Sequence, residues 1–477
     1  MNNDQTKLVD RLYKELVAGN LGIFAGAGFS QSAGYVNWKE LLRPIALDLD
    51  LDIEQETDLV ALAQYHLTRH EGRNKLNQEL VEAFSAKLKP TENHRILARL
   101  PISTYWTTNY DQLIERSLED AHKIPDIKHS RDHLPVTKYK RDAIVYKMHG
   151  DVGSPNEAVL TRDDYERYHV KMAPFIDALK GDLVSKTLLF LGFSFTDPNL
   201  DYILSRVRVM YEKNRRQSEC ILRHVTREED EAPEQFEYRK RKQEFFQREL
   251  IRYGLRVTYV DEFSEITDIL RALETKYRHR SIFISGAAHD YSLLPFPKEE
   301  SERFVFELAK ELSKKDKRIL SGFGLGIGGA VISGVVEATA MGGSALDEDR
   351  LLVRPFPQDK VGNMSRDDLW RAYRDDILKR AGIAIFVFGN KLEGGEVILS
   401  TGMRHEFEIG LENKVFPIPV GRTGGMAEEL WGELMRKIAD GSFVVDPKVA
   451  PLIQELGDSS KSLDEIKATI LNIVSLI

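Results

Sequence analysis

The chain has 477 residues, of which 42% are hydrophobic and 30% charged, and its formal net charge is −8. This length exceeds one ordinary core, so we expect two or three soluble domains. The acidic balance, without a basic patch, argues against nucleic-acid binding. The first twenty residues are charged and amphipathic, and no apolar run reaches the ~18 residues that span a bilayer. We therefore expect a cytoplasmic protein that binds no membrane.

Metal binding is also unexpected from the sequence. The single cysteine, Cys220, excludes internal disulfides and a four-cysteine zinc site. We expect no pair of histidines at helical ligand spacing beside a carboxylate, so added zinc or a chelator should change nothing.

In the first half of the chain, short β-rich apolar runs alternate with helical patterns, which predicts α/β layers around a mostly parallel sheet. A helix is expected over Asp197 to Tyr211, where Asp197 can cap and Pro198 occupies the first turn. The charge-dense segment 227–252 predicts a solvated helical face without chemistry. Six strands are expected here: Leu21–Phe24, Tyr105–Thr108, Ala143–Met148, Thr187–Leu191, Cys220–Arg223 and Val257–Val260.

The pattern restarts near residues 274–281, where a new first strand follows a charged stretch. We therefore divide the chain into domains over 1–278 and 279–477, and the second has an ordinary domain size. The expected fold class is α/β, with two Rossmann-like domains that each carry a mostly parallel sheet flanked by helices. The second half has five expected strands: Ile282–Ile284, Arg318–Leu320, Leu351–Arg354, Ile383–Phe388 and Val415–Val420.

Four expected strands of the first half end in glycine and small polar or ionisable residues. The four stretches read AGAGFS, TTNYD, KMHGD and GFSFTDPN. Ligands of open α/β sheets bind outside the carboxyl ends of the strands, so these stretches predict one shared site.

The residue types at these strand ends suggest their roles. Glycines let backbone N–H groups reach a diphosphate and Ser30 adds a hydroxyl, although a plain tight turn explains the glycines as well. His149 exchanges a proton near neutral pH, and its place at a strand end favours catalysis over a structural role. Asn109 cannot act as a base but can hold a hydroxyl or a water, and Asp111 can fix the ribose or the water.

These motifs, in this order, resemble the sirtuin NAD-binding domain over about residues 1–275. Sirtuins cleave the bond between nicotinamide and ribose in NAD. The resemblance implies that Asn109 and Asp111 serve the nicotinamide ribose and that His149 is the general base. The residues that it places along the diphosphate and the adenosine side are Ala25, Gly26, Ala27, Gly28, Ser30, Gly192, Phe193 and Ser194.

The sequence departs from protein-deacylating sirtuins, which carry a four-cysteine zinc module that one cysteine cannot build. Without an acyl acceptor, water can capture the cation at the ribose carbon, so we expect hydrolysis of NAD to ADP-ribose and nicotinamide. Nicotinamide leaves as a neutral molecule, so no acid is needed, and NAD is a substrate with no further cofactor. The alternative is a non-catalytic NAD- or nucleotide-binding regulatory protein, which the glycine turns serve equally but which does not explain Asn109 and His149.

In the second half, the stretch RILSGFGLGIGGAV joins a strand to a glycine run and a helix. It satisfies the G-x-G-x-x-G spacing, which close packing of a helix on a strand explains as well. Arg374 on a helix and Lys391 at a strand end are candidates to face phosphates, unless Arg374 only pairs with Asp375 on an exposed surface. We expect Glu406 to begin a helix and to take ribose hydroxyls. The expected ligand-binding residues are Ser285 and Gly286 after the first strand, then Gly322, Gly324, Gly326, Arg374, Lys391 and Glu406.

This half resembles the SLOG family, Rossmann-like domains that sense nucleotide-derived ligands. A sirtuin-like domain followed by a SLOG domain resembles the effector family of the Thoeris anti-phage system. The resemblance implies that a TIR-domain partner makes a cyclic ADP-ribose isomer upon infection, that the SLOG domain binds it as an activator, and that the first domain then depletes NAD. It also implies a homotetramer.

Overall fold

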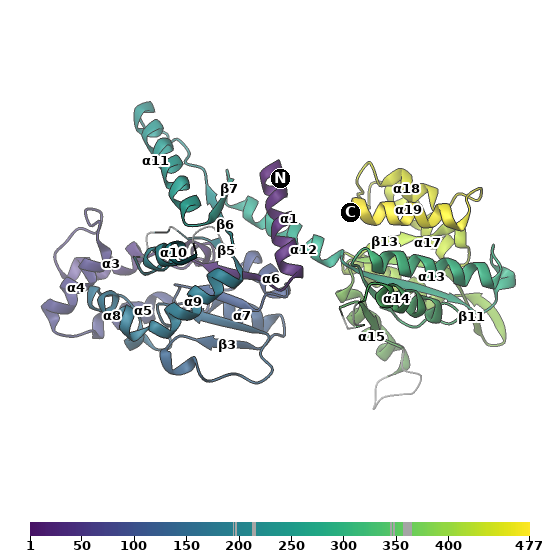
Figure 1. Ribbon diagram of the computed structural model, residues 1–477, viewed down its shortest axis with the longest axis horizontal. Coiled ribbons are helices and arrows are strands. Elements are labelled where there is room, and N and C mark those ends of the chain that lie inside the picture. Colours follow the sequence, from purple (N-terminus) through teal and green to yellow (C-terminus); the bar gives the residue numbers. More distant parts are fainter. Residues whose placement is uncertain (194, 196–197, 212–215, 344–345, 347–348, 356–364) are drawn as a thin grey trace. The chain divides into compact units, whose positions relative to one another are not determined.

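The structure is a computed structural model that describes residues 1–477 except 194, 196–197, 212–215, 344–345, 347–348 and 356–364 (Figure 1). The described chain divides into two compact units, Met1–Glu274 and Thr275–Ile477. The division predicted after residue 278 falls slightly later, at the end of helix α12 (Ser264–Arg278). Within the described residues, no helix is long and apolar enough to cross a membrane.

Seven parallel strands form the sheet of the first unit, in the order β3-β4-β2-β1-β5-β6-β7. From β1 the chain fills one side of the sheet and then crosses to β5 on the other side. Loops that leave neighbouring strands diverge at such a reversal, and they open a crevice at the carboxyl edge. The strands are β1 (Leu21–Ala25), β2 (Thr104–Thr107), β3 (Pro125–Lys128), β4 (Ala143–Lys147), β5 (Thr187–Leu191), β6 (Ser218–Arg223) and β7 (Leu255–Val260).

The six strands expected in the first half are confirmed, and β3 is an additional edge strand. The charged segment forms helix α11, whose buried residue is Leu250. The helix expected over Asp197 to Tyr211 is α10. Its predicted cap, Asp197, lies outside the described residues. The helices of this unit are α1 (Asn3–Val17), α2 (Ala27–Gln31), α3 (Trp38–Asp48), α4 (Leu59–His70), α5 (Asn74–Ser85), α6 (Glu92–Arg99), α7 (Leu113–Asp120), α8 (Arg162–Lys171), α9 (Ala173–Ser185), α10 (Pro198–Tyr211), α11 (Pro233–Arg252) and α12.

The second unit has a sheet in the order β10-β9-β8-β11-β12, with β13 also paired to β11. Its strands are parallel except for the β11–β12 hairpin. The strands are β8 (Ser281–Ala288), β9 (Arg318–Ser321), β10 (Leu351–Val353), β11 (Ile383–Glu393), β12 (Glu396–Leu399) and β13 (Phe416–Pro419). The helices are α13 (Lys298–Lys314), α14 (Gly328–Met341), α15 (Arg366–Arg380), α16 (Thr401–Glu412), α17 (Met426–Ala439), α18 (Ala450–Glu455) and α19 (Leu463–Leu476). The predicted α/β class with two mostly parallel sheets is confirmed.

Candidate active site and sensor site

The ends of β1 and β5 are joined by backbone contacts between glycines. The N–H of Gly28 donates to the carbonyl of Gly192 at 2.9 Å, and the N–H of Gly26 donates to Leu191 at 2.9 Å. Gly192 has a φ of +62°, and a Cβ there would lie 2.1 Å from the backbone nitrogen of Phe29. The glycines therefore allow two loops to pack backbone against backbone, and the N–H groups of Gly26 and Gly28 are used inside the protein in this conformation.

The other residues expected around the diphosphate and the adenosine lie at the same two strand ends. Ala25 is the buried last residue of β1, and Ala27 is the exposed first residue of α2. Phe193 follows β5, with its ring edge-on to Phe24 at a centroid distance of 5.3 Å. Ser194 lies outside the described residues.

Asn109 joins the end of β2 to the end of β1. Its Nδ2 donates to the Gly26 carbonyl at 2.9 Å and to the Ser30 hydroxyl at 2.7 Å. Its backbone N–H donates to Thr107 Oγ1 at 2.9 Å. Because both amide hydrogens are used, the atom that Asn109 has left to offer a ligand is Oδ1, a hydrogen-bond acceptor.

Asp111 is 4% exposed and follows Asn109 by two residues. One carboxylate oxygen, Oδ1, accepts a hydrogen bond from the backbone N–H of Leu113 at 2.9 Å, at the start of α7. The other oxygen, Oδ2, is buried and has no hydrogen-bond partner among the described residues. A buried carboxylate oxygen without a donor is costly, and a hydroxyl of a bound ligand can supply that donor.

His149 lies two residues after β4 and is 4% exposed. Its ring is surrounded by Tyr110, Tyr165 and Tyr168, at centroid distances of 6.5, 5.7 and 6.4 Å. Tyr110 stands between Asn109 and Asp111 in the sequence, so its contact with His149 joins the ends of β2 and β4. Asn109 is hydrogen-bonded to Ser30, Asp111 follows it in the chain, and Tyr110 between them contacts His149. We call Ser30, Asn109, Asp111 and His149 the strand-end site.

Lys147, the last residue of β4, underlies this site and was not predicted from the sequence. Its side chain is fully buried, and its Nζ lies 3.0 Å from Glu115 Oε1 and 2.5 Å from Asp151 Oδ2. The same Nζ donates to the backbone carbonyls of Tyr110 and Asp111. Burial alone would lower the pKa of Lys147, but the two carboxylates raise it on balance. The sequence offered one indication of this buried ion pair, a lysine inside the apolar stretch AIVYKM, because a buried lysine needs partners of opposite charge.

In the second unit, three of the predicted ligand-binding residues meet inside the fold. Ser285 of β8 donates to Glu406 Oε2 at 2.6 Å, and Arg374 Nε of α15 lies 3.6 Å from Glu406 Oε1. All three are buried. Burial raises the pKa of Glu406, against the lowering effects of Ser285 and Arg374. Arg374 therefore faces the interior, whereas Asp375 pairs with Lys379 at 2.5 Å.

Lys391 reaches the same region from the sheet. Its Nζ donates to Thr401 Oγ1 at 2.8 Å, at the start of α16, and also pairs with Glu393. A Cβ on Gly402, the next residue, would lie 3.0 Å from Arg374 Nη2, so Arg374 also contacts the start of α16. The structure brings both predicted cations to one helix start. We call Ser285, Arg374, Lys391 and Glu406 the sensor site.

Three positional predictions for the second unit are wrong. Ser285 and Gly286 lie within β8 rather than after it, because the strand continues by pairing with Phe386 and Val387 of the long strand β11. Lys391 lies within β11, whose hairpin with β12 extends it to Glu393. Glu406 is in the middle of α16, which begins at Thr401 after Ser400.

The glycine run of the second unit is packed on the end of β8. A Cβ on Gly324 would lie 1.9 Å from the carbonyl oxygen of Gly286. Gly326 has a φ of +81°, and a Cβ there would lie 2.3 Å from the Ala288 carbonyl. Gly322 follows β9 directly and is partly buried. Sequence reasoning missed the exposed apolar residues beside these glycines, which are Phe323 and Leu325, at 51% and 62% exposure.

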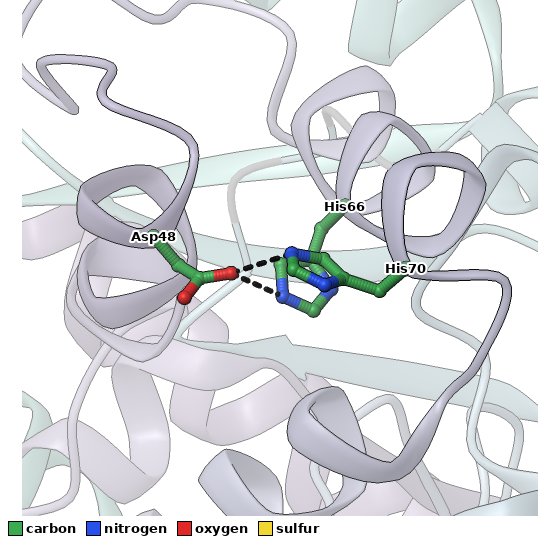
Figure 2. A group of neighbouring side chains, drawn as sticks. All are labelled: Asp48, His66 and His70. Carbon is green, nitrogen blue, oxygen red and sulfur yellow. Dashed lines mark hydrogen bonds and ion pairs between the residues drawn. The ribbon is translucent and has the colours of Figure 1, made fainter.

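The expectation that no histidine pair stands at helical ligand spacing beside a carboxylate is wrong. His66 and His70 are one turn apart on α4, and the Nε2 atoms lie 3.0 and 2.7 Å from Asp48 Oδ2 (Figure 2). The carboxylate comes from the end of α3, a separate helix, so the sequence around the histidines does not reveal it. We call these three residues the α3–α4 cluster.

Comparisons with known proteins match the two halves of the chain to two different families. Residues 103–257 match the family described as the SIR2-like domain, and residues 265–477 match the Sir2- and TIR-associating SLOG family. NAD(+) hydrolase ThsA of Bacillus cereus is 47% identical over 97% of this chain and 96% of its own length. NAD(+) hydrolase ThsA of Acinetobacter baumannii is 43% identical over 100% of this chain and 99% of its own. Defense-associated sirtuin 2 of Bacillus subtilis is 24% identical over 44% of this chain and 21% of its own length.

Proposed function

The chain belongs to the ThsA family of NAD(+) hydrolases, and on that premise we propose that its strand-end site hydrolyses NAD in defence against phage. The reaction breaks the bond between ribose and nicotinamide, and both bonding electrons leave with the nicotinamide nitrogen. Water then bonds to the ribose carbon and gives ADP-ribose. Because nicotinamide leaves as a neutral molecule, this chemistry requires no Lewis acid, and we propose that no metal takes part in it.

Asp111 and Asn109 have the acceptor atoms that this reaction needs around the ribose. The open Oδ2 of Asp111 accepts a ribose hydroxyl, and its negative charge stabilises the oxocarbenium-like transition state at the neighbouring carbon. Oδ1 of Asn109 accepts a hydrogen bond from the attacking water or from the second ribose hydroxyl. Positioning of this kind converts a reaction with bulk water into one with a single oriented water.

His149 is the proposed general base. It removes a proton from the water as the new carbon–oxygen bond forms, and then releases that proton to solvent. The three surrounding tyrosines fix the plane of its ring, because they restrict its rotation from several sides.

The observation that carries this proposal is the direct connection between the strand ends. A hydrogen bond from Asn109 to Ser30 joins the end of β2 to the end of β1, and the contact of Tyr110 with His149 joins the end of β2 to the end of β4. A regulatory protein that only binds NAD has no use for a base at this position.

Product analysis distinguishes hydrolysis from binding alone. We expect the full-length protein, incubated with NAD and its activator, to release nicotinamide and linear ADP-ribose in equal amounts, separated by chromatography. Saturable NAD binding in calorimetry without nicotinamide release, in the presence and absence of activator, would instead support the regulatory alternative.

For the second unit we propose a sensor of a cyclic ADP-ribose isomer that a TIR-domain protein supplies. Two observations support this: the family description names TIR association, and the sensor site pairs Arg374 with the buried Glu406 while Arg374 and Lys391 both contact the start of α16. The cations suit phosphates and Glu406 suits ribose hydroxyls. The homotetramer expected from the resemblance stays a prediction.

A further inference from the structure

The α3–α4 cluster has the composition and geometry of a metal site. We propose that Asp48, His66 and His70 together bind one divalent transition-metal ion of the zinc type (Figure 2). Two imidazoles and one carboxylate are the ligands that such ions take in three-ligand protein sites.

The ligand atoms already lie close to coordination geometry. Both Nε2 atoms point at a single oxygen, Asp48 Oδ2, at 3.0 and 2.7 Å, and one ligand atom from each residue lies within 4.8 Å of the others. Zinc binds these atoms at about 2.0–2.1 Å, so ligands in a tetrahedral site stand about 3.3 Å apart. An ion therefore enters with small side-chain adjustments, and Figure 2 shows the three groups facing one another.

The backbone positions these ligands rigidly. The spacing from His66 to His70 places both rings on one face of α4, with centroids 4.4 Å apart. The side chain of His66 is 1% exposed, whereas those of His70 and Asp48 are 43% and 26% exposed. The cluster thus has a buried floor and an open side, which gives an ion an entry path and leaves its fourth position to water.

The surrounding charges leave the required oxygen available. Lys75 Nζ pairs with the other carboxylate oxygen, Oδ1, at 2.8 Å. Arg69 bonds to the backbone carbonyl of Asp48 and lies 4.0 Å from Asp50. Asp48 thus uses Oδ1 for Lys75 and presents Oδ2 to both histidines. Lys75 also opposes the charge of an incoming cation, so the site has moderate rather than very high affinity.

A bound ion ties α3 to α4 within the helical layer that they form with α5. The core of this layer combines apolar residues of α3, α4 and α5 with Tyr110, whose ring contacts His149. None of the three ligands belongs to the strand-end site. The proposed ion therefore stabilises the layer and takes no part in NAD chemistry.

The test is a calorimetric titration in which Zn²⁺ alone is added to chelator-treated, full-length protein. We expect one saturable equivalent for the wild type, and at least about tenfold weaker binding for His70→Gln and for Asp48→Asn. His169→Gln, which changes an exposed histidine on α8, is the matched control and should bind as the wild type does. A hundredfold excess of zinc over its Kd should raise the melting temperature of the wild type by about 5 °C or more.

A second variant keeps all three ligands. Lys75→Gln removes the opposing charge and should therefore tighten zinc binding. If the three residues only form hydrogen bonds and bind no metal, this substitution should produce no change in zinc affinity. Absence of saturable binding in the wild type would overturn the proposal. Equal zinc affinity in the wild type, His70→Gln and Asp48→Asn would overturn it as well, since the ion would then bind elsewhere.

Discussion

Asn109 has one side-chain atom left for a ligand, Oδ1, because its two amide hydrogens are donated to Gly26 and Ser30. A side chain fixed in this way loses little conformational freedom when substrate binds, so its acceptor contributes to orienting the reacting groups. The same two bonds also stabilise the fold, so we expect Asn109 to have a structural role besides the catalytic role that we propose.

We expect His149→Ala and Asn109→Ala each to lower NAD cleavage by about 10²–10⁴-fold, because base catalysis and positioning are typically worth that much. The two variants should differ in stability. Asn109→Ala loses two buried hydrogen bonds and should cost about 1–3 kcal/mol in the free energy of unfolding. NAD consumption and thermal melting, measured on the same samples, separate the two effects.

The exposed histidine variant His169→Ala is the control for these assays, and it should retain both activity and melting temperature. Near-normal turnover in a well-folded His149→Ala protein would remove His149 from the mechanism.

Among single residues, the sequence revealed those that follow strands, because motif and strand end coincide there. Asn109, Asp111 and His149 could be predicted together for this reason. Lys147 and the α3–α4 cluster could not, because their partners come from other elements: Glu115 from α7, and Asp48 from α3. For Gly26 and Gly28 the sequence left open a diphosphate contact or a tight turn. The structure adds that Gly28 and Gly192 contact each other's backbones, and sequence does not show which loops meet.

At the scale of elements, Lys147 holds the loops after β2 and β4 together. Its ammonium pairs with Glu115 and Asp151 and is shielded from solvent, since the side chain is fully buried. Burial alone would raise the pKa of Asp151, but Lys147 lowers it on balance, whereas burial keeps the pKa of Glu115 raised. The Asp151 contribution to stability is present above the unfolded pKa of about 3.9 and is lost as the pH falls through the lower folded value.

Lys147→Met should destabilise the first unit by about 3–5 kcal/mol at pH 7.5, because it leaves two carboxylates buried without their cation. In the variant, burial raises the pKa of both carboxyls above their unfolded values. The loss of unfolding free energy is then largest at high pH, and it shrinks as Glu115 and Asp151 take up protons toward pH 5.

Chemical denaturation of wild type and variant at pH 7.5 and pH 5 tests this pH dependence. The difference in unfolding free energy should narrow at the lower pH. Lys171→Met, on the exposed end of α8, should show no difference at either pH. If the difference in unfolding free energy between wild type and Lys147→Met stays constant or widens at pH 5, the carboxylates are not the source of the instability.

Most strands could be predicted because they are buried apolar runs, and the two that were missed lack this pattern. β3 begins with a proline and contains Asp126 and Lys128, and it pairs on one side with β4 as an edge strand. Edge strands tolerate proline and charge because part of their hydrogen-bonding capacity faces away from the sheet. β12 is a short hairpin strand after Gly394 and Gly395, whose positive φ values make the turn. A Gly-Gly pair between two short runs was the available indication.

For the whole molecule, the control of NAD cleavage that we propose requires the activator to bind the active and inactive states with different affinity. The sensor site offers chemistry for such a difference. Arg374 and Glu406 form a buried pair, and Lys391 and Arg374 both contact the start of α16. A phosphate between the two cations would compete with Glu406 for Arg374 and so would alter the contact between α15 and α16.

We therefore expect Arg374→Ala and Lys391→Ala each to raise the concentration of cyclic ADP-ribose isomer needed for half-maximal NAD cleavage by about ten- to a hundredfold. Each charge-assisted contact to phosphate is worth roughly 1.5–3 kcal/mol, which corresponds to that range.

Lys379→Ala is the control. It removes an exposed cation from the same helix α15 and should leave activation unchanged, which separates the specific contacts from the general charge of the surface. Calorimetry of activator binding, run beside NAD loss by fluorescence, shows whether affinity itself has changed. Because Arg374→Ala leaves the buried Glu406 without its cation, thermal melting of the same samples is needed to separate loss of activation from loss of stability. Unchanged activator affinity in both Arg374→Ala and Lys391→Ala would place the sensor site elsewhere in the second unit.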